Sequence, residues 1–415
     1  MKNVIALIMC IGLLWSPVYS WDHFKGSLER TGSSTLPAPD TPYLLWEVDL
    51  ESSLYSSPVV MNELVFQVAL EKVVCLDLGT GNVVWTSCIP AYHSTPAVSY
   101  DRIIVATNRG VAALSLDEGT LLWEYVVAGR FSTLPLSDYI VSSPAVSGGK
   151  VVVGTRPYSQ LHIDPPPNDF DDLYLICLDE FNGKERWYVR TTLGVYSSPC
   201  ISYKKVFAAS REMLCIDMTT GDILWNSEYT HPYNLEFSKN ERYNFDDSTP
   251  ALYHGILIGG SSVMGWSQVE PRFEGFQKIV AMDQYTGDIL WEWIEEDALA
   301  SSPAVYKGKI YFYSFDGMVR CLSFLDGTEL WETSISEKKE FDTKGLRLWP
   351  SLSVADGKVY IGSINGMFFC LDADTGEILW EYETGGPIHS APAFAWGKVL
   401  ISSTDGHLYC FAIDP

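Results

Sequence analysis

A pattern that ends in tryptophan recurs through this chain and limits what the chain can fold into. In its clearest copies a small residue is followed by Asp, then by Thr-Gly, and finally by Trp. Apolar residues flank the Gly on both sides, so each copy predicts a strand, a tight turn and a second strand. A repeat at a fixed period indicates a solenoid, a propeller or a similar array. The copies are Cys75 to Trp85, Ala113 to Trp123, Cys177 to Trp187, Cys215 to Trp225, Ala281 to Trp291, Cys321 to Trp331 and Cys370 to Trp380.

A second signature, Ser-Ser-Pro or a close variant, precedes each copy. Its proline is residue 58, 96, 144, 199, 250, 303 or 392, and a degenerate copy lies near Leu352. After it comes an alternating run rich in Val, Ile and Tyr, such as Lys309 to Tyr313, and then a Gly turn. These runs are typical of strands. Each repeat therefore predicts four strands, here called A, B, C and D.

Eight repeats of four antiparallel strands predict an all-β fold, an eight-bladed β-propeller. The alternative, a β-solenoid, needs much shorter repeats. The last repeat contains strands A, B and C, with Cys410 in register, but no strand D. The isolated run from Leu44 to Leu50 has the character of a D strand. We expect this N-terminal strand around Trp46 to complete the last blade and close the ring.

One tryptophan per blade is expected to dock against the neighbouring blade. The Gly permits the turn between strands C and D, and the small residue is expected to leave room for the neighbour's indole. Replacing such a Trp by Ala should cost about 3–5 kcal/mol. The docking residues are Trp46, Trp85, Trp123, Trp187, Trp225, Trp291, Trp331 and Trp380.

The N-terminus is typical of a secretory signal. Lys2 is followed by an apolar run from Val4 to Trp15 that is short for a membrane span, and Val18 and Ser20 fit a cleavage site before Trp21. We expect export to the cell envelope or beyond, with an uncleaved anchor as the alternative, and no membrane span in the mature chain. The predicted organisation is a signal at 1–20, a lead-in at 21–43 and one propeller domain at 44–415.

Charge and cysteine placement exclude several classes of function. A net charge of −24 argues against nucleic acid as a partner. Most of the eight cysteines after residue 20 occupy equivalent positions of successive repeats, too far apart for disulfides. No C-x-x-C zinc signature occurs, so these cysteines are interpreted as small, buried apolar residues.

The repeats resemble those of the PQQ-like eight-bladed β-propellers. Ala281 to Trp291 matches their tryptophan-docking motif in full, and Trp21, Phe24 and Thr31-Gly32 look like the lead-in of exported members. One branch of that family holds pyrroloquinoline quinone (PQQ) and calcium beside a vicinal Cys-Cys disulfide. This sequence has no adjacent cysteines and no cytochrome c motif. The other branch, similar to the outer-membrane assembly propeller, is a cofactor-free scaffold for protein partners.

Insertions into the repeat locate a candidate site. The spacing from Trp to the next Pro is normally 11–12 residues, but it is 25 between Trp225 and Pro250. The B-to-C segments are also lengthened, after Pro144 and after Pro250. In an antiparallel blade, D-to-A and B-to-C loops emerge on the same face, so we expect all the insertions on one side, where loops carry function. Their polar and aromatic residues give these candidates for partner or ligand binding: Arg130, Arg156, Tyr158, His162, Asp164, His231, Tyr233, Arg242, Asp246, Asp247, Trp266, Arg272 and Trp349.

Specific metal and catalytic motifs find little support. The acidic run 168–172 lacks the Gly and Glu positions of an EF-hand, and His162 and His231 have no metal-ligand spacing. No G-x-S-x-G, H-E-x-x-H or P-loop is present. We therefore expect a monomeric, non-enzymatic propeller with no cofactor, which binds a protein or cell-envelope partner. The alternative is a PQQ- and calcium-dependent dehydrogenase or another small-molecule enzyme.

Overall fold

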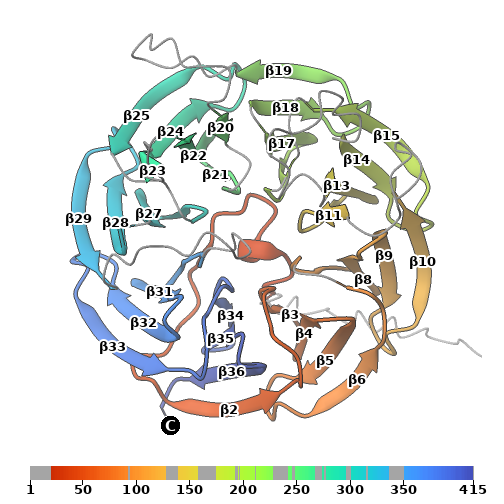
Figure 1. The fold of residues 1–415 in the computed structure, drawn as a ribbon, viewed down its shortest axis with the longest axis horizontal. Coiled ribbons are helices and arrows are strands. Elements are labelled where there is room, and N and C mark those ends of the chain that lie inside the picture. The colour runs from red at the N-terminus through yellow and green to blue at the C-terminus, as the bar shows by residue number, and fades with distance from the viewer. Residues whose placement is uncertain are drawn as a thin grey trace, which may run out of the picture.

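Eight antiparallel sheets stand in a ring around a central axis (Figure 1). The computed structural model describes residues 20–91, 94–127, 139–157, 174–191, 195, 197–210, 212–227, 242–244, 248–266, 273–274, 277–295, 301–314, 316–335 and 350–414. The prediction of an all-β eight-bladed propeller is confirmed. The described residues contain one short 3-10 helix, η1 (Phe24–Gly26), and no helix long and apolar enough to cross a membrane.

The first four blades follow the predicted A-B-C-D order. In each, the short strand A lies nearest the axis and strand D forms the outer edge (Figure 1). The strands are β3 (Val59–Met61), β4 (Leu64–Ala69), β5 (Lys72–Asp77) and β6 (Val83–Ser87) in blade 1; β7 (Ala97–Ser99), β8 (Arg102–Ala106), β9 (Gly110–Ser115) and β10 (Leu121–Val126) in blade 2; β12 (Ala145–Ser147), β13 (Lys150–Pro157), β14 (Tyr174–Asp179) and β15 (Glu185–Arg190), with an added β11 (Tyr139–Val141), in blade 3; and β16 (Cys200–Ser202), β17 (Lys205–Ala209), β18 (Met213–Asp217) and β19 (Ile223–Ser227) in blade 4.

The remaining four blades complete the circle. In blade 8 the outer strand is β2, from the N-terminal part of the chain, which pairs antiparallel with β36 and places Trp46 opposite Cys410. The strands are β21 (Ala251–Tyr253), β22 (Ile256–Trp266), β24 (Gln277–Asp283) and β25 (Ile289–Glu295), with added β20 (Arg242–Asn244) and β23 (Phe273–Glu274), in blade 5; β26 (Ala304–Tyr306), β27 (Lys309–Tyr313), β28 (Met318–Ser323) and β29 (Glu329–Ser334) in blade 6; β30 (Ser353–Ala355), β31 (Lys358–Gly362), β32 (Met367–Asp372) and β33 (Ile378–Glu383), with the parallel β1 (Ser33–Ser34), in blade 7; and β34 (Ala393–Ala395), β35 (Lys398–Ser402), β36 (His407–Ala412) and β2 (Leu44–Asp49) in blade 8.

Seven of the eight docking tryptophans pack over a glycine of the next blade. A Cβ added at Gly119 would lie 2.5 Å from the Trp85 ring, and one added at Gly221 would lie 2.9 Å from Trp187. The indole nitrogen also bonds to a carbonyl of that blade, as in Trp123 Nε1 to Glu180 O at 2.8 Å. The sequence predicted that the small residue receives the neighbour's indole. The structure instead places the glycine under that indole, and the small residue pairs with its own Trp, as Cys75 does with Trp85.

Trp380 differs from the other seven docking tryptophans. It packs on Phe411 of blade 8, with ring centroids 6.0 Å apart. Blade 8 takes its D strand from the N-terminus, so it has no C-to-D turn to supply a carbonyl. The buried Trp380 Nε1 has no hydrogen-bond partner among the described residues. At this docking position, aromatic packing takes the place of the contact with a glycine and of the indole hydrogen bond.

The Ser-Ser-Pro signature is explained by two hydrogen bonds. The first serine bonds to strand B of its own blade, as in Ser56 Oγ to Val68 O at 2.9 Å and Ser197 Oγ to Ala209 O at 3.0 Å. The second residue of the signature accepts a hydrogen bond from the preceding blade. For example, Thr95 Oγ1 of blade 2 accepts from Ser57 N of blade 1 at 3.1 Å. These hydroxyls link neighbouring blades near the axis, beside the short A strands. Equivalent links are Thr95 N to Ser143 Oγ, Ser198 N to Thr249 Oγ1, Thr249 N to Ser302 Oγ and Ala391 N to Ser57 Oγ.

The lead-in fills the centre of the ring, where Figure 1 shows it as the red segment. Strand A of every blade has an open inner edge, and an unpaired buried N–H is costly. The lead-in pairs with this edge in seven blades. The donors and acceptors are Val60 N to Trp21 O, Val98 N to Asp22 O, Val146 N to His23 Nε2, Ile201 N to Leu28 O, Leu252 N to Glu29 O, Val305 N to Thr31 O and Val354 N to Gly32 O.

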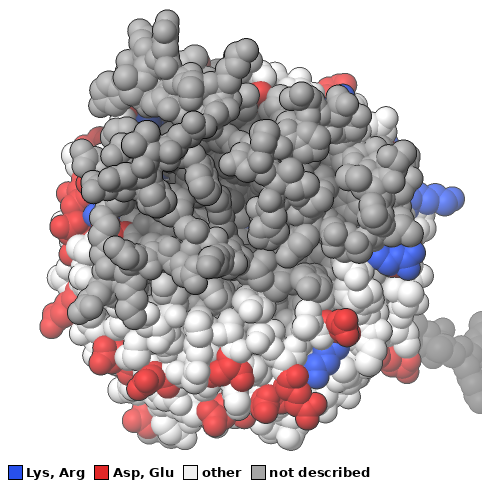
Figure 2. Space-filling model, viewed as in Figure 1, with Lys and Arg blue, Asp and Glu red and all other residues white. Residues whose placement is uncertain are grey.

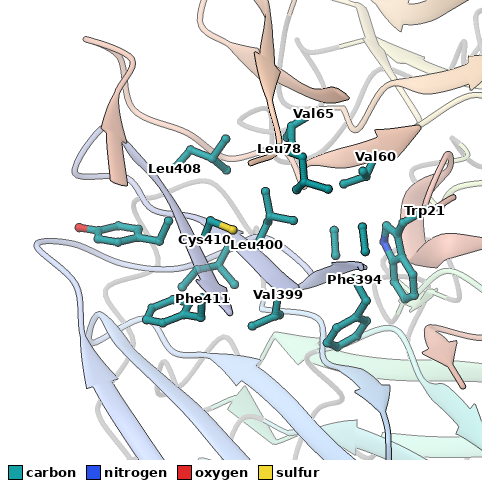
Figure 3. Close-up of a cluster of buried hydrophobic side chains, with 14 of the residues drawn as sticks. Trp21, Val60, Val65, Leu78, Phe394, Val399, Leu400, Leu408, Cys410 and Phe411 are labelled. Atoms are coloured by element: carbon teal, nitrogen blue, oxygen red, sulfur yellow. The ribbon is translucent and has the colours of Figure 1, made fainter. Parts of the chain in front are cut away.

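The eighth blade meets the lead-in through its core. The Trp21 ring packs edge-on against Phe394, with centroids 5.2 Å apart. Around this contact, Figure 3 shows apolar side chains of blades 8 and 1 facing one another, among them Leu400 and Val60. The seam where the two ends of the chain meet is therefore a continuous core.

The turn aspartates predict how stability depends on pH. The Asp217 carboxylate accepts bonds from Thr220 N and Thr219 N, and these bonds lower its pKa. The pKa of Asp283 is lowered in the same way by Tyr285 N and Thr286 N. Because the folded pKa lies below the unfolded one, this stabilisation is present above the unfolded pKa, about 3.9, and is lost as pH falls through the folded value.

We therefore expect the double variant Asp217→Asn/Asp283→Asn to be less stable than the parent at neutral pH. The gap in unfolding free energy should shrink between about pH 5 and about pH 2. Urea unfolding across that range measures it. Asp117→Asn/Glu118→Gln, at exposed positions outside these hydrogen bonds, is the matched control. A gap that stays constant with pH would contradict the prediction.

Candidate functional site

The insertions of blades 3 and 5 form raised strand pairs on one face of the ring. In blade 3, β11 from the D-to-A insertion pairs with the end of β13, and Ile140 lies opposite Arg156. In blade 5, β20 pairs with the end of β22, and β22 also pairs with β23. As the sequence predicted, the two kinds of insertion meet on the same side in both blades. This side is called the insertion face, and the side with the A-to-B and C-to-D turns is called the short-turn face.

Three of the predicted site residues lie on these raised strands. Arg156 is in β13, Arg242 is opposite Met264 in the β20–β22 pair, and Trp266 is opposite Phe273. Their backbones are thus fixed by strand pairing rather than by free loops. The other predicted residues lie outside the described residues: Arg130, Tyr158, His162, Asp164, His231, Tyr233, Asp246, Asp247, Arg272 and Trp349.

Short B-to-C turns on the same face are tied down by charged groups. In blade 6 the Arg320 guanidinium donates to Asp316 and Ser314 and lies 3.4 Å from the Glu332 carboxylate. Burial opposes its charge, but the Asp316 hydrogen bond and charge prevail and raise the pKa of Arg320. In blade 8 Asp405 accepts bonds from Tyr409 Oη and Gly385 N, both at 2.7 Å. These turns are rigid borders beside the raised strands.

Sequence reasoning missed an aromatic pair at the axis. Tyr55 and His389 stack with ring centroids 5.6 Å apart and planes 26° apart. Each stands directly before a Ser-Ser-Pro or Ser-Ala-Pro signature, in the D-to-A loops of blades 1 and 8. Their position before the signature was the available signal, because that position opens toward the axis on the insertion face.

Two cations of the lead-in are buried against main-chain carbonyls of the blades. Lys25 Nζ donates to Ser302 O at 2.8 Å and to Pro303 O at 2.7 Å, and burial lowers the pKa of Lys25 well below its usual value. Arg30 donates to Pro199 O, Phe24 O and Pro144 O at 2.7–3.0 Å, and burial lowers its pKa to about 10. Main-chain carbonyls, rather than carboxylates, therefore hold both charges.

The cysteines do not fit a quinone site of the kind that the resemblance implies for one branch. All eight are free thiols, and seven are buried singly, mostly in the C strands. Burial raises the pKa of Cys75 to about 12 and that of Cys215 to about 11, which leaves them as unreactive thiols at neutral pH. Cys88 is exposed, contrary to the prediction that all are buried. Among the described residues, no group of three or more His, Cys, Asp or Glu gathers as a metal site.

Comparison with known proteins relates this chain to a family. A sequence model of the family of the outer membrane protein assembly factor BamB matches residues 35–165, 144–252, 271–341 and 316–414. BamB of Yersinia pestis is 25% identical over 166 residues, which is 38% of this chain and 38% of that protein. BamB of Moranella endobia (strain PCIT) is 24% identical over 142 residues, 34% of this chain and 33% of that protein. The matches thus span little more than a third of these relatives.

Solved structures share the architecture. BamB from Moraxella catarrhalis superposes with a TM-score of 0.65 at 16% identity, over 89% of this chain and 99% of that one. The quinohemoprotein alcohol dehydrogenase from Comamonas testosteroni gives 0.69 at 13% identity, over 95% and 80%. Likeness at these identities establishes the fold alone. The family model covers most of the chain and confirms the resemblance to PQQ-like propellers, and this chain therefore belongs to the family of the outer membrane protein assembly factor BamB.

Proposed function

We propose that this protein is a non-catalytic scaffold of the cell envelope that holds a protein partner on its insertion face. The carrying observation is the pair of raised strand extensions on blades 3 and 5, which stand on the same side of a closed ring. Family membership supports the proposal, because relatives carry the name of an outer membrane assembly factor. In this proposal, residues 1–20 act as the secretory signal that directs export.

Strand pairing suits a surface for protein recognition. Residues on paired strands lose less freedom on binding than residues on free loops, so more of the contact energy appears as affinity. Aromatic and Arg side chains are the usual anchors of protein interfaces. The raised strands and their insertions are rich in both, with Arg156, Arg242 and Trp266 at paired positions.

Surface charge favours a partner with basic groups. In Figure 2, Asp and Glu lie along the described edge of the insertion face, with few Lys or Arg among them. In the outer strands of blades 8 and 7, the exposed residues include Glu47, Asp49, Glu381 and Glu383. With a net charge of −24, this surface should steer a basic partner and weaken its hold as salt rises.

Site-specific crosslinking in cells tests the proposal. A photo-reactive phenylalanine placed at Tyr233 or Trp266, in the inserted segments, should capture one defined envelope protein. The same probe at Tyr100 or Leu325, exposed on the short-turn face, is the matched control. Capture from the control positions but not from the insertions would overturn the proposal.

A deletion provides the second arm. Removing residues 229–241 leaves β20 whole and shortens the spacing from Trp225 to Pro250 from 25 residues to the usual 12. The ring should fold with an unchanged melting temperature, because the excised segment lies outside the repeat, while partner capture falls at least tenfold. Unchanged capture would contradict the assignment of the partner to this face.

A quinoprotein-type dehydrogenase is the second candidate, favoured by the shared architecture of the quinohemoprotein enzyme. The protein incubated with PQQ and calcium should then show quinone absorbance and dye-linked alcohol oxidation. Neither signal is expected under the scaffold proposal.

A further inference from the structure

A cavity opens on the short-turn face, between blades 4 and 5 and beside the lead-in. Its volume is about 300 Å³, and its lining includes Glu29, Ser202, Tyr203, Leu252, His254 and Gln284. It lies on the opposite side of the ring from the insertions, so a ligand bound there would not depend on the partner proposed for the insertion face. A volume of this size is at the lower end of small-molecule sites.

Glu29 contributes the one formally charged carboxylate of this lining. The lead-in holds it in place: Leu252 N donates to Glu29 O at 2.8 Å, and Ile201 N donates to Leu28 O at 2.9 Å. Among the described residues, no ion pair or hydrogen bond engages the Glu29 carboxylate. The cavity therefore presents a negatively charged hydrogen-bond acceptor on a backbone that the blades hold in place.

Two rings flank the opening, both on A-to-B turns. Tyr203 is 93% exposed, and the His254 ring packs edge-on against Tyr253 at 4.2 Å. The face of a tyrosine ring attracts a cation. A nearby contact of that kind already exists, because Lys205 Nζ lies 4.3 Å from the centre of the Tyr285 ring.

The turn that carries Tyr203 is strained. Tyr203 and Lys204 have φ of 51° and 78°, in the left-handed region. Most blades share the first of these, as Lys307 does with φ of 47°, and the second is the one that distinguishes this turn. At the position of Lys204, blades 5 to 8 have glycine, for example Gly255 with φ of 82°. A left-handed non-glycine residue costs of order 1–3 kcal/mol, and such strain clusters at binding sites.

Polar groups complete the lining. Ser202 offers a hydroxyl and Gln284 an amide, while the Gln284 carbonyl of the main chain is already engaged by Trp225 Nε1 at 3.1 Å. Leu252 supplies an apolar wall. A carboxylate, two rings, an apolar wall and hydrogen-bonding groups together match an ammonium ion on a short aliphatic stem.

We propose that this cavity binds an organic ammonium group, with the ammonium paired to Glu29 and its carbon stem between Tyr203 and His254. Free aliphatic amines and lysine side chains of a protein share this chemistry. The site adds a second recognition surface on the face that lacks insertions.

Calorimetric titration with N-acetyl-lysine methylamide tests the site. Saturable binding is expected, and the matched norleucine derivative, which lacks the ammonium, should bind at least tenfold more weakly. Glu29→Gln keeps the shape of the side chain and should weaken lysine binding about tenfold. Glu71→Gln, at an exposed position in the B-to-C turn of blade 1, is the control and should bind as the parent does.

Tyr203→Ala keeps the test decisive if Glu29→Gln fails to fold, because a side chain 93% exposed has little part in folding. It should weaken binding about threefold. Butylammonium and a lysine-containing peptide then separate the two sources: equal affinities indicate free amines, and tighter peptide binding indicates a protein partner. Absent binding, equal norleucine binding or unchanged affinity in both variants would overturn the proposal.

Discussion

Replacing Arg30 by methionine is expected to destabilise the ring by about 3 kcal/mol or more. The guanidinium is fully buried and bonds to carbonyls of Pro199, Phe24 and Pro144, in two different blades and the lead-in itself. Methionine has similar length but no donor, so two buried carbonyls and one partly buried carbonyl would lose their partner. Each such loss costs about 1–3 kcal/mol.

Urea unfolding followed by tryptophan fluorescence measures this loss. Arg109→Met, at an exposed arginine in the B-to-C turn of blade 2, is the matched control and should change the unfolding free energy by less than about 0.5 kcal/mol. A loss below about 1 kcal/mol for Arg30→Met would mean that water replaces the guanidinium, and that the lead-in closes the ring without this residue.

The blades could be predicted because their determinants are local. Gly376 and Trp380 lie four residues apart, and the turn and strand they specify need no distant partner. Every C-to-D pair also contains a bulge at the same place, as between Cys370 and Leu371, so one register serves all copies. Consistency among local signals made the fold readable.

The centre of the ring could not be predicted, because its contacts are not local. The part of the lead-in that bonds to the A strands is residues 21–32, which contain no repeat, yet its bonds reach from Val60 to Val354. The hydroxyl of Thr95 serves Ser57, 38 residues away, a distance no sequence pattern encodes. The Ser-Ser-Pro signature was visible in the sequence, but the hydrogen bonds between blades that explain it were not.

The candidate sites divide in the same way. Insertion lengths predicted the face, because interruptions of a fixed period are visible in the sequence. They did not predict that β11 would pair with β13, or β20 with β22. The cavity at Glu29 joins the lead-in to turns of two blades, and residues 29, 203, 254 and 284 share no spacing.

Two glycines of blade 6 allow the docking contact to be weighed separately from backbone strain. Gly327 has φ of 73°, and a Cβ there would lie 2.5 Å from Trp291 Cε3. Gly308 has φ of 77°, and a Cβ there would meet nothing within 4 Å. Gly308→Ala should therefore cost only the left-handed backbone penalty, about 1–2 kcal/mol.

Gly327→Ala should cost that penalty plus about 1–3 kcal/mol for displacing the indole. The displaced Trp291 would also strain its bond from Nε1 to Phe324 O, now 3.2 Å. Urea unfolding of both variants gives the difference. In a Trp291→Ala background the indole is gone, so the cost of Gly327→Ala should fall to that of Gly308→Ala. Equal costs for the two glycines in the parent protein would mean that the indole yields freely, and that the blades are held by their hydroxyl links and lead-in rather than by tryptophan docking.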